Sequence, residues 1–283
     1  MSTSWLYSNP RTCLKMEKLF HGLGVPLTPG MHDHPAFLAA ECEDPRLLEP
    51  FARYVESRQY LPEYLADSRY KIQVVADAVY QAVRQDGRLG ACVDASGIIG
   101  RMLDTLGIWN YVVKASLTID FPHSTGLPRT CYWAVDEGEF EAPHAFVVAP
   151  PFAVVDVTVS LQPFRLGQGA HLPTHIVADN VLPAQWSIHD IVSPSAQALA
   201  KRHKMAAIAL VNPQMQEVMQ WLPPRKVQFG DTALRYIPLA IGGFAEPLAG
   251  ITGYKPGGRT AQEIFDQDVI PKLAGPHAAA HSP

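Results

Sequence analysis

Residues 90–108 read Gly90-Ala-Cys-Val-Asp-Ala-Ser-Gly-Ile-Ile-Gly-Arg-Met-Leu-Asp-Thr-Leu-Gly-Ile108. Apolar side chains recur here at the spacing of one helix face, from Ala95 to Leu106, and Gly107 suits a C-terminal cap. The pattern predicts a proline-free helix that begins around Cys92. Unpaired N–H groups and the helix dipole stabilise negative charge at the start of a helix, so a thiolate is favoured there. Cys92 is therefore a candidate nucleophile.

A thiolate nucleophile needs a base that takes its proton and a third group that holds this base in one tautomer. The candidate base is His144, in Pro-His-Ala-Phe-Val-Val, and the candidate orienting group is Asp156, in Ala-Val-Val-Asp-Val-Thr. Both lie in expected neighbouring strands that a turn at Pro150-Pro151 joins, so a His–Asp hydrogen bond is expected. An aspartate between valines also needs a partner if it is buried, and a histidine is suitable.

The remaining sequence predicts an α+β protein in which helices precede an antiparallel sheet. Residues 45–83 have helical periodicity, and a junction between two helices is expected near Asp67 and Ser68. β-branched and aromatic runs predict strands at 111–119, 131–135, 144–148 and 153–159. Farther along, the patterns favour helices at 194–210 and 214–221, then short extended pieces and loops over the Gly- and Pro-rich segment 234–258.

The order of these motifs is similar to that of a known superfamily. Cys92-Val-Asp-Ala-Ser opens an apolar helix that ends in Leu-Gly-Ile, and a strand, His144-Ala-Phe and Val-Asp156-Val-Thr follow. In this order the chain resembles the transglutaminase-like superfamily, which has a papain-like cysteine fold. The resemblance covers about residues 70–160. It implies that Cys92 is the nucleophile, His144 the general base and Asp156 its orienting residue.

Three positions depart from the superfamily pattern. Phe146 stands where a tryptophan is usual, Ala95 where an aromatic residue is usual, and Asn110 where an arginine is common just after the helix. These departures leave the three candidate catalytic residues in place and concern the substrate groove.

The resemblance also implies an oxyanion hole, which stabilises the tetrahedral intermediate of acyl transfer. The backbone N–H of Cys92 is one candidate donor. By analogy with papain-like enzymes, the carboxamide of Gln85 is the candidate second donor, with Gln81 or a tryptophan elsewhere as alternatives.

The motifs suggest a division of the chain into four parts. Residues 46–160 form the expected transglutaminase-like catalytic core. Residues 1–45 are an N-terminal extension, residues 161–274 a C-terminal extension packed on the core, and residues 275–283 a mobile tail.

The composition of the 283 residues, 47% hydrophobic and 18% charged, is that of a soluble globular protein. With 23 basic and 27 acidic residues the net charge is −4, so neither nucleic acid nor an anionic membrane is an expected partner. The N-terminus lacks the pattern of a secretory signal, and no segment reaches the roughly 20 apolar residues of a membrane span. A cytoplasmic location is expected.

The remaining cysteines and the histidine pairs give no further site. Four cysteines, at 13, 42, 92 and 131, are too few and too scattered for a disulfide framework or a paired zinc motif, so we expect reduced thiols. His32-Asp33-His34 and the pair His171 and His175 each lack an identifiable third metal ligand. No metal and no cofactor are expected.

The leading functional expectation is a cysteine-dependent acyl-transfer enzyme that works through a thioester at Cys92. A peptide, a protein or a small amide is the expected substrate. Water as acceptor would make it a peptidase, amidase or deamidase, and an amine would make it a transglutaminase-type transferase. Two alternatives stay open: an acyl-CoA transferase similar to the arylamine acetyltransferases, and an inactive binding module with the same fold. The oligomeric state is left open.

Overall fold

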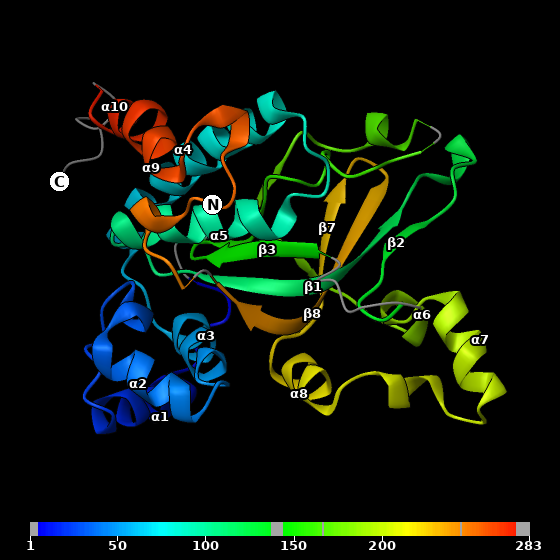
Figure 1. Ribbon diagram of the computed structural model, residues 1–283, viewed down its shortest axis with the longest axis horizontal. Coiled ribbons are helices and arrows are strands. Elements are labelled where there is room, and N and C mark those ends of the chain that lie inside the picture. The colour runs from blue at the N-terminus through cyan, green and yellow to red at the C-terminus, as the bar shows by residue number, and fades with distance from the viewer. Residues whose placement is uncertain (1–4, 137–143, 166, 244, 276–283) are drawn as a thin grey trace.

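The computed structural model describes residues 5–136, 144–165, 167–243 and 245–275. It confirms the α+β class, with an N-terminal helical region that leads into an antiparallel sheet (Figure 1). The N-terminal helices are α1 (Pro10–Gly22), α2 (Pro35–Glu43), α3 (Leu48–Ser57), α4 (Pro62–Asp86) and α5 (Cys92–Thr105). Residues 276–283, most of the expected mobile tail, lie outside the described residues.

The predicted junction near Asp67 and Ser68 is wrong, because the chain leaves the helix earlier, between α3 and α4. Pro62 occupies the first turn of α4 and holds the preceding residue, Leu61, in an extended conformation. Asp67 instead pairs with Lys71 within α4 at 2.6 Å, and Ser68 is fully buried. Polar residues at the expected junction are thus part of one long helix.

Eight strands in the described residues form one sheet in which every pair of neighbours is antiparallel. They are β1 (Tyr111–Asp120), β2 (Thr130–Tyr132), β3 (His144–Ala149), β4 (Phe152–Asp156), β5 (Ile176–Ala178), β6 (Leu182–Pro183), β7 (Arg225–Phe229) and β8 (Thr232–Gly242). The order across the sheet is β5-β4-β3-β1-β8-β7-β6, and β2 pairs with the second half of β1. The predicted strands at 131–135 and 153–159 end sooner, at Tyr132 and Asp156.

Strand β8 corrects the expectation of short pieces and loops over 234–258. It has 11 residues and pairs with β1 from Val112 to Asp120. Pro238 argues against a central strand because it has no N–H for the ladder. The sheet accommodates it at an irregularity, where the register with β1 shifts next to the Ala115–Pro238 pair.

The C-terminal half adds helices α6 (Ile188–Ile191), α7 (Pro194–Arg202), α8 (Pro213–Trp221), α9 (Ala261–Ile264) and α10 (Ile270–Leu273). The helix expected over 194–210 ends at Arg202, because Lys204 adopts a left-handed backbone conformation with φ 56°. A short 3-10 turn follows at Ala207–Leu210.

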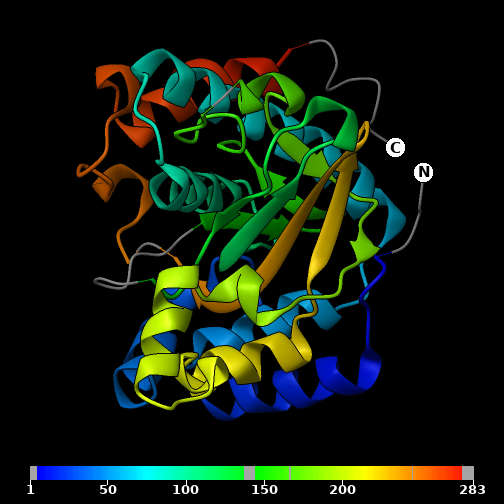
Figure 2. The same cartoon turned by 90° about the vertical axis from the view of Figure 1, so that its right-hand side faces the viewer.

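Helices cover both faces of the sheet (Figure 2). On one face, α3 and α8 contact the sheet and α1 and α2 pack against α3, around a large apolar cluster that contains Phe20, Phe51 and Val218. On the other face, α4, α5 and the C-terminal helices enclose a second cluster that contains Ile98 and Phe265. Residues 1–45, expected as an extension, therefore supply part of the first cluster. Residues 161–274, expected as the other extension, supply parts of both clusters and, among the described residues, four strands of the sheet.

An ion pair is buried within the first cluster. Arg225 of β7 pairs with the Glu56 carboxylate of α3, and each residue is less than a tenth exposed. The hydroxyl of Tyr111 donates to the same carboxylate at 2.6 Å, and Arg225 also donates to the carbonyl of Ala153 at 2.6 Å. This pair joins α3 to strands β1, β4 and β7.

Candidate active site

Cys92 is the first residue of α5, as predicted, and its side chain is almost fully buried. Buried apolar residues along the helix, among them Ile99 and Leu103, hold α5 against the sheet. At the far end of the helix Gly107, with φ 71°, carries the chain out of the last turn. The helix start is therefore held in a fixed position, with the thiol at the end where N–H groups have no helical partner.

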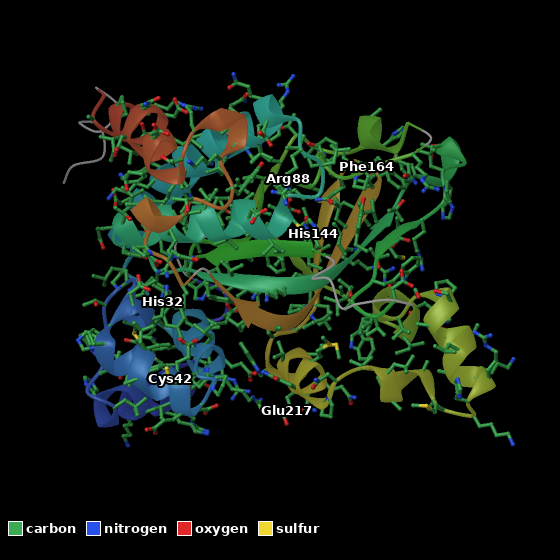
Figure 3. All side chains as sticks on the ribbon, in the orientation of Figure 1. His32, Cys42, Arg88, His144, Phe164 and Glu217 are labelled. Carbon is green, nitrogen blue, oxygen red and sulfur yellow. The ribbon has the colours of Figure 1, made fainter. Side chains whose placement is uncertain are left out.

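The segment that enters α5 is held in place by two contacts. Gly90 donates its N–H to the carbonyl of Leu161 at 3.0 Å. Arg88 forms an ion pair with Asp94, in the first turn of the helix, at 2.9 Å. Figure 3 shows Arg88 and His144 close to the same end of α5.

His144 and Asp156 meet across one hairpin, as the sequence predicts. His144 begins β3, Asp156 ends β4, and the turn between the strands contains the cis peptide bond Pro150-Pro151. The Nε2 atom of His144 lies 2.7 Å from Oδ2 of Asp156. Both side chains are fully buried.

Asp156 also accepts hydrogen bonds that the sequence analysis did not predict. Its Oδ1 atom accepts from the backbone N–H of Thr158 at 2.9 Å and from the Thr158 hydroxyl at 3.0 Å. Its Oδ2 atom accepts from the hydroxyl of Tyr236, on β8, at 2.9 Å. The position of Thr158, two residues after the aspartate, is a local signal that could have been used. Tyr236 is 80 residues away in a strand that the sequence analysis missed, so no local pattern reveals it.

The buried pair shifts the pKa values of both partners. Burial alone would lower the pKa of His144, but the charge and hydrogen bond of Asp156, with a contribution from Cys92, raise it to about 10. Burial alone would raise the pKa of Asp156, but His144 and the hydrogen bonds from Thr158 and Tyr236 bring it below its usual value. The environment thus favours an imidazolium beside a carboxylate.

The Nδ1 atom of His144 is the ring nitrogen that can interact with Cys92. Nε2 is engaged by Asp156, and Nδ1 is buried without a hydrogen bond to any described residue. The thiol of Cys92 is near enough to contribute to the raised pKa of His144. Burial raises the pKa of the Tyr132 phenol, and the charges of Cys92 and Asp156 raise it further.

His144 and Tyr132 meet where β1 changes partners. His144 lies opposite Ala115 of β1, and Tyr132, the last residue of β2, lies opposite Leu117. The rings of Tyr132 and His144 have centroids 6.3 Å apart. The interruption between β2 and β3 therefore lies next to the start of α5.

The structure does not group Gln85 with these residues. Gln85 is exposed in the last turn of α4, and its carboxamide faces Gly257, within 4 Å of the position that a Cβ atom there would occupy. Two of the three positions that depart from the superfamily pattern are fully buried: Ala95 in the cluster around α5, and Phe146 against the ring of Tyr236. Asn110 donates to the carbonyl of Gly100 and to Asp104.

The remaining cysteines lie in other surroundings. Cys13 hydrogen-bonds Glu17, and burial together with this carboxylate raises its pKa to about 11. Cys131 is near Thr118, Cys42 is exposed, and none of the four is in a disulfide. Only Cys92 combines a helix start with a histidine neighbour among the described cysteines.

The His32 motif forms an ionic cluster around Arg101. The Nη1 atom of Arg101 lies 2.8 Å from the His32 ring and 2.6 Å from Asp33, and Asp104 lies 3.4 Å from both Arg101 and His32. A guanidinium in this position occupies the place that a cation would need. Among the residues that the structure describes, no three His, Cys, Asp or Glu side chains are arranged to hold a metal ion.

The raised pKa of His144 and the lowered pKa of Asp156 predict a pH range in which this pair contributes most to the free energy of unfolding. The raised pKa of His144 gives a contribution that is complete below the ordinary histidine value of 6.5 and is lost as the pH rises toward about 10. The lowered pKa of Asp156 gives a contribution that is present above 3.8 and is lost as the pH falls below that value. Urea unfolding of the wild-type protein and of Asp156→Asn should therefore differ most between these limits. A difference that grows as the pH rises above 6.5 would contradict the assignment.

The substitution Tyr236→Phe is expected to destabilise the protein by about 1.5–3 kcal/mol, because a buried carboxylate loses one of its donors. Urea unfolding near neutral pH measures this loss. A matched control is Tyr254→Phe, which removes a longer hydrogen bond, 3.3 Å, to the exposed Asp86. The control should change the free energy of unfolding by less than about 1 kcal/mol. Equal losses in the two variants would show that Tyr236 does not support Asp156.

Comparison with protein-family models, curated proteins and solved structures finds no match to this chain. Within the described part of the chain, none of the helices has both the length and the apolar character that crossing a bilayer requires.

Proposed function

We propose that this protein is a cysteine-dependent acyl-transfer enzyme with a transglutaminase-like, papain-like fold. One observation carries the proposal. Asp156 binds Nε2 of a fully buried His144 and leaves Nδ1 for Cys92 at the start of a helix. A base that one carboxylate orients, next to a thiol where a thiolate is stabilised, is the arrangement that nucleophilic catalysis needs.

In the proposed reaction, Nδ1 of His144 takes the proton of the Cys92 thiol, and Sγ attacks the carbonyl carbon of an amide or ester. The oxyanion that forms accepts a hydrogen bond from the backbone N–H of Cys92. The imidazolium then returns its proton to the leaving amine or alcohol, and a thioester remains on Cys92. Water or an amine attacks the thioester, His144 takes a proton from this acceptor, and the thiolate leaves as the acid or amide product departs.

The raised pKa of His144 supports this sequence of proton transfers. The charge and hydrogen bond of Asp156 overcome the cost of burial and stabilise the imidazolium that the first step produces. Thr158 and Tyr236 stabilise the carboxylate in turn. The proposed substrate is a peptide, a protein or a small amide. We propose a cytoplasmic location, where free thiols stay reduced.

The burial of Cys92 favours the alternative of a binding module without activity. The residue is 4% exposed, and the ring of its neighbour His144 lies 6.3 Å from the ring of Tyr132, with Phe164 packed edge-on against Tyr132. A substrate carbonyl must therefore reach a thiol that is almost fully buried. Formation of an acyl adduct on Cys92 distinguishes an acyl-transfer enzyme from a binding module.

Mass spectrometry after incubation with p-nitrophenyl acetate tests the proposal. The wild-type protein should gain one acetyl group, and peptide mapping should locate it on Cys92. His144→Gln should lose this adduct, whereas Cys42→Ala, which removes an exposed thiol, should retain it. Absence of an adduct on Cys92, or equal labelling of wild type and His144→Gln, would favour the binding module.

A further inference from the structure

Helix α1 packs one face on the molecule and leaves the opposite face in solvent. Met16 and Phe20, on the inner face, are buried in the first apolar cluster. The outer face consists of residues at the spacing of one side of a helix, and all of them are exposed: Arg11, Leu14, Lys15, Lys18, Leu19 and Gly22. This face carries three positive charges and no negative charge. The reaction proposed for Cys92 gives it no role.

The cations of this face have no ion-pair partner within the described part of the chain. The ion pairs that involve arginine or lysine there use other residues than Arg11, Lys15 and Lys18. Glu17, the acidic residue of α1, is half-buried and accepts a hydrogen bond from the thiol of Cys13. The helix therefore does not neutralise its own outer face.

A shallow depression beside Lys15 also contains carboxylates. Glu49 and Glu217 line it, and Arg46 forms an ion pair with each of them. Asp44 lines it as well and accepts the backbone N–H of Arg46. Asp44 is thus one carboxylate beside three unpaired cations, and the face keeps a net positive charge.

Two leucines flank the row of cations. At about 100° per residue, Leu14 lies on one side of the row formed by Arg11, Lys15 and Lys18, and Leu19 lies on the other side. The two leucines are 51% and 38% exposed. Exposed leucines beside lysine and arginine are typical of helices at a membrane interface, where cations contact lipid headgroups and apolar side chains enter the boundary with the acyl chains.

The end of α7 and the turn that follows it have the same composition. Residues 191–216 contain no aspartate or glutamate. Basic and large apolar side chains are exposed together in this segment: Leu199, Lys201, Arg202, Lys204, Met205 and Ile208. A second basic and apolar surface is therefore present far from α1 in the sequence.

Both basic segments lie along one edge of the molecule. Helix α1 and the end of α7 are at the lower edge in Figure 1, and they remain at the lower edge in the rotated view of Figure 2. A flat surface along this edge can therefore contact both segments at once. The net charge of −4 is an average over the chain, and it hides this local excess of positive charge.

We propose that this edge docks on the surface of a membrane that contains anionic lipids. Arg11, Lys15 and Lys18 contact the lipid headgroups together with Lys201 and Lys204, and the exposed apolar side chains of both segments enter the interface. The negative potential of a cytoplasmic leaflet attracts such basic clusters, which agrees with the proposed cytoplasmic location. Nucleic acid would bind the cations but would leave the leucines in water, so the composition favours a lipid surface. This docking does not depend on the reaction proposed for Cys92.

Co-sedimentation of the full chain with sucrose-loaded vesicles tests the proposal. Phosphatidylcholine vesicles with about 30% phosphatidylserine should bind half of the protein at about 1 mM lipid, and vesicles of phosphatidylcholine alone should not bind it. Raising the salt concentration from about 0.1 M to about 0.5 M should weaken binding at least about tenfold. The triple variant Arg11→Gln/Lys15→Gln/Lys18→Gln should bind at least about tenfold more weakly, and Leu14→Ser at least about threefold more weakly.

A matched control distinguishes a docking edge from a general effect of charge. Arg84→Gln/Lys255→Gln/Lys272→Gln removes three exposed cations outside the two segments, and its binding should stay within about twofold of the wild type. No binding to the anionic vesicles up to about 5 mM lipid would overturn the proposal. Equal binding of wild type and the α1 triple variant, or equal losses in the two triple variants, would also overturn it. If Leu14→Ser binds like the wild type and a soluble polyglutamate peptide displaces the vesicles, the edge recognises acidic protein segments and the proposal is overturned.

Discussion

The substitution Cys92→Ala is expected to lower the hydrolysis of p-nitrophenyl acetate by this protein by about 10⁴-fold or more, because the proposed acyl intermediate forms on Cys92. Stopped-flow absorbance of the released nitrophenol measures both the initial burst and the steady rate. The burst should disappear entirely, since it reports the formation of the thioester.

Two other variants show whether the loss is chemical rather than structural. Cys131→Ala removes a cysteine at the edge of the same sheet, and its burst should match that of the wild type. His144→Gln should also lose most of the burst, because the thiol then has no base. The unfolding midpoint of Cys92→Ala should stay close to that of the wild type. A persistent burst in Cys92→Ala would exclude Cys92 as the nucleophile.

The substitution Glu56→Leu is expected to destabilise the fold by about 3–5 kcal/mol, because it leaves the guanidinium of Arg225 buried without its carboxylate. The hydroxyl of Tyr111, which donates to the same carboxylate at 2.6 Å, would lose its acceptor as well. Equilibrium unfolding in guanidinium chloride measures the loss, provided that the transition has two states.

A double variant distinguishes an ion pair from simple packing. Glu56→Leu combined with Arg225→Met removes both charges, so it should be less destabilised than the sum of the two single variants. Lys71→Gln breaks the partly exposed pair with Asp67 and should cost less than about 1 kcal/mol. Strict additivity of the two single losses would mean that Glu56 and Arg225 do not interact energetically.

The parts of this fold that follow from the sequence are those that local patterns control. The start of α5 at Cys92 and its end before Gly107 agree with capping and periodicity. The hydrogen bond between His144 and Asp156 is confirmed because one short hairpin joins them, so little else determines their relative position. The catalytic role of these residues stays a prediction.

The errors arose where a neighbouring element overrides a local pattern. Pro238 is typical of a loop, yet pairing with β1 across the middle of the sheet holds it in a strand. Tyr236 lies in this strand. Because Pro238 favours a loop over a strand, the sequence also gives no sign that Tyr236 donates a hydrogen bond to Asp156. The oxyanion role of Gln85 rests on analogy alone and stays a prediction, and its carboxamide lies near Gly257.

The place of β8 in the middle of the sheet has a consequence for biosynthesis. A ribosome releases Cys92, His144 and Asp156 well before Tyr236, because chains emerge from the N-terminus. Until β8 pairs with β1, the open edge of β1 lacks its partner and the Asp156 carboxylate lacks the Tyr236 donor. The nascent chain therefore carries its thiol, imidazole and carboxylate in an unfinished sheet until roughly residue 242 has left the exit tunnel.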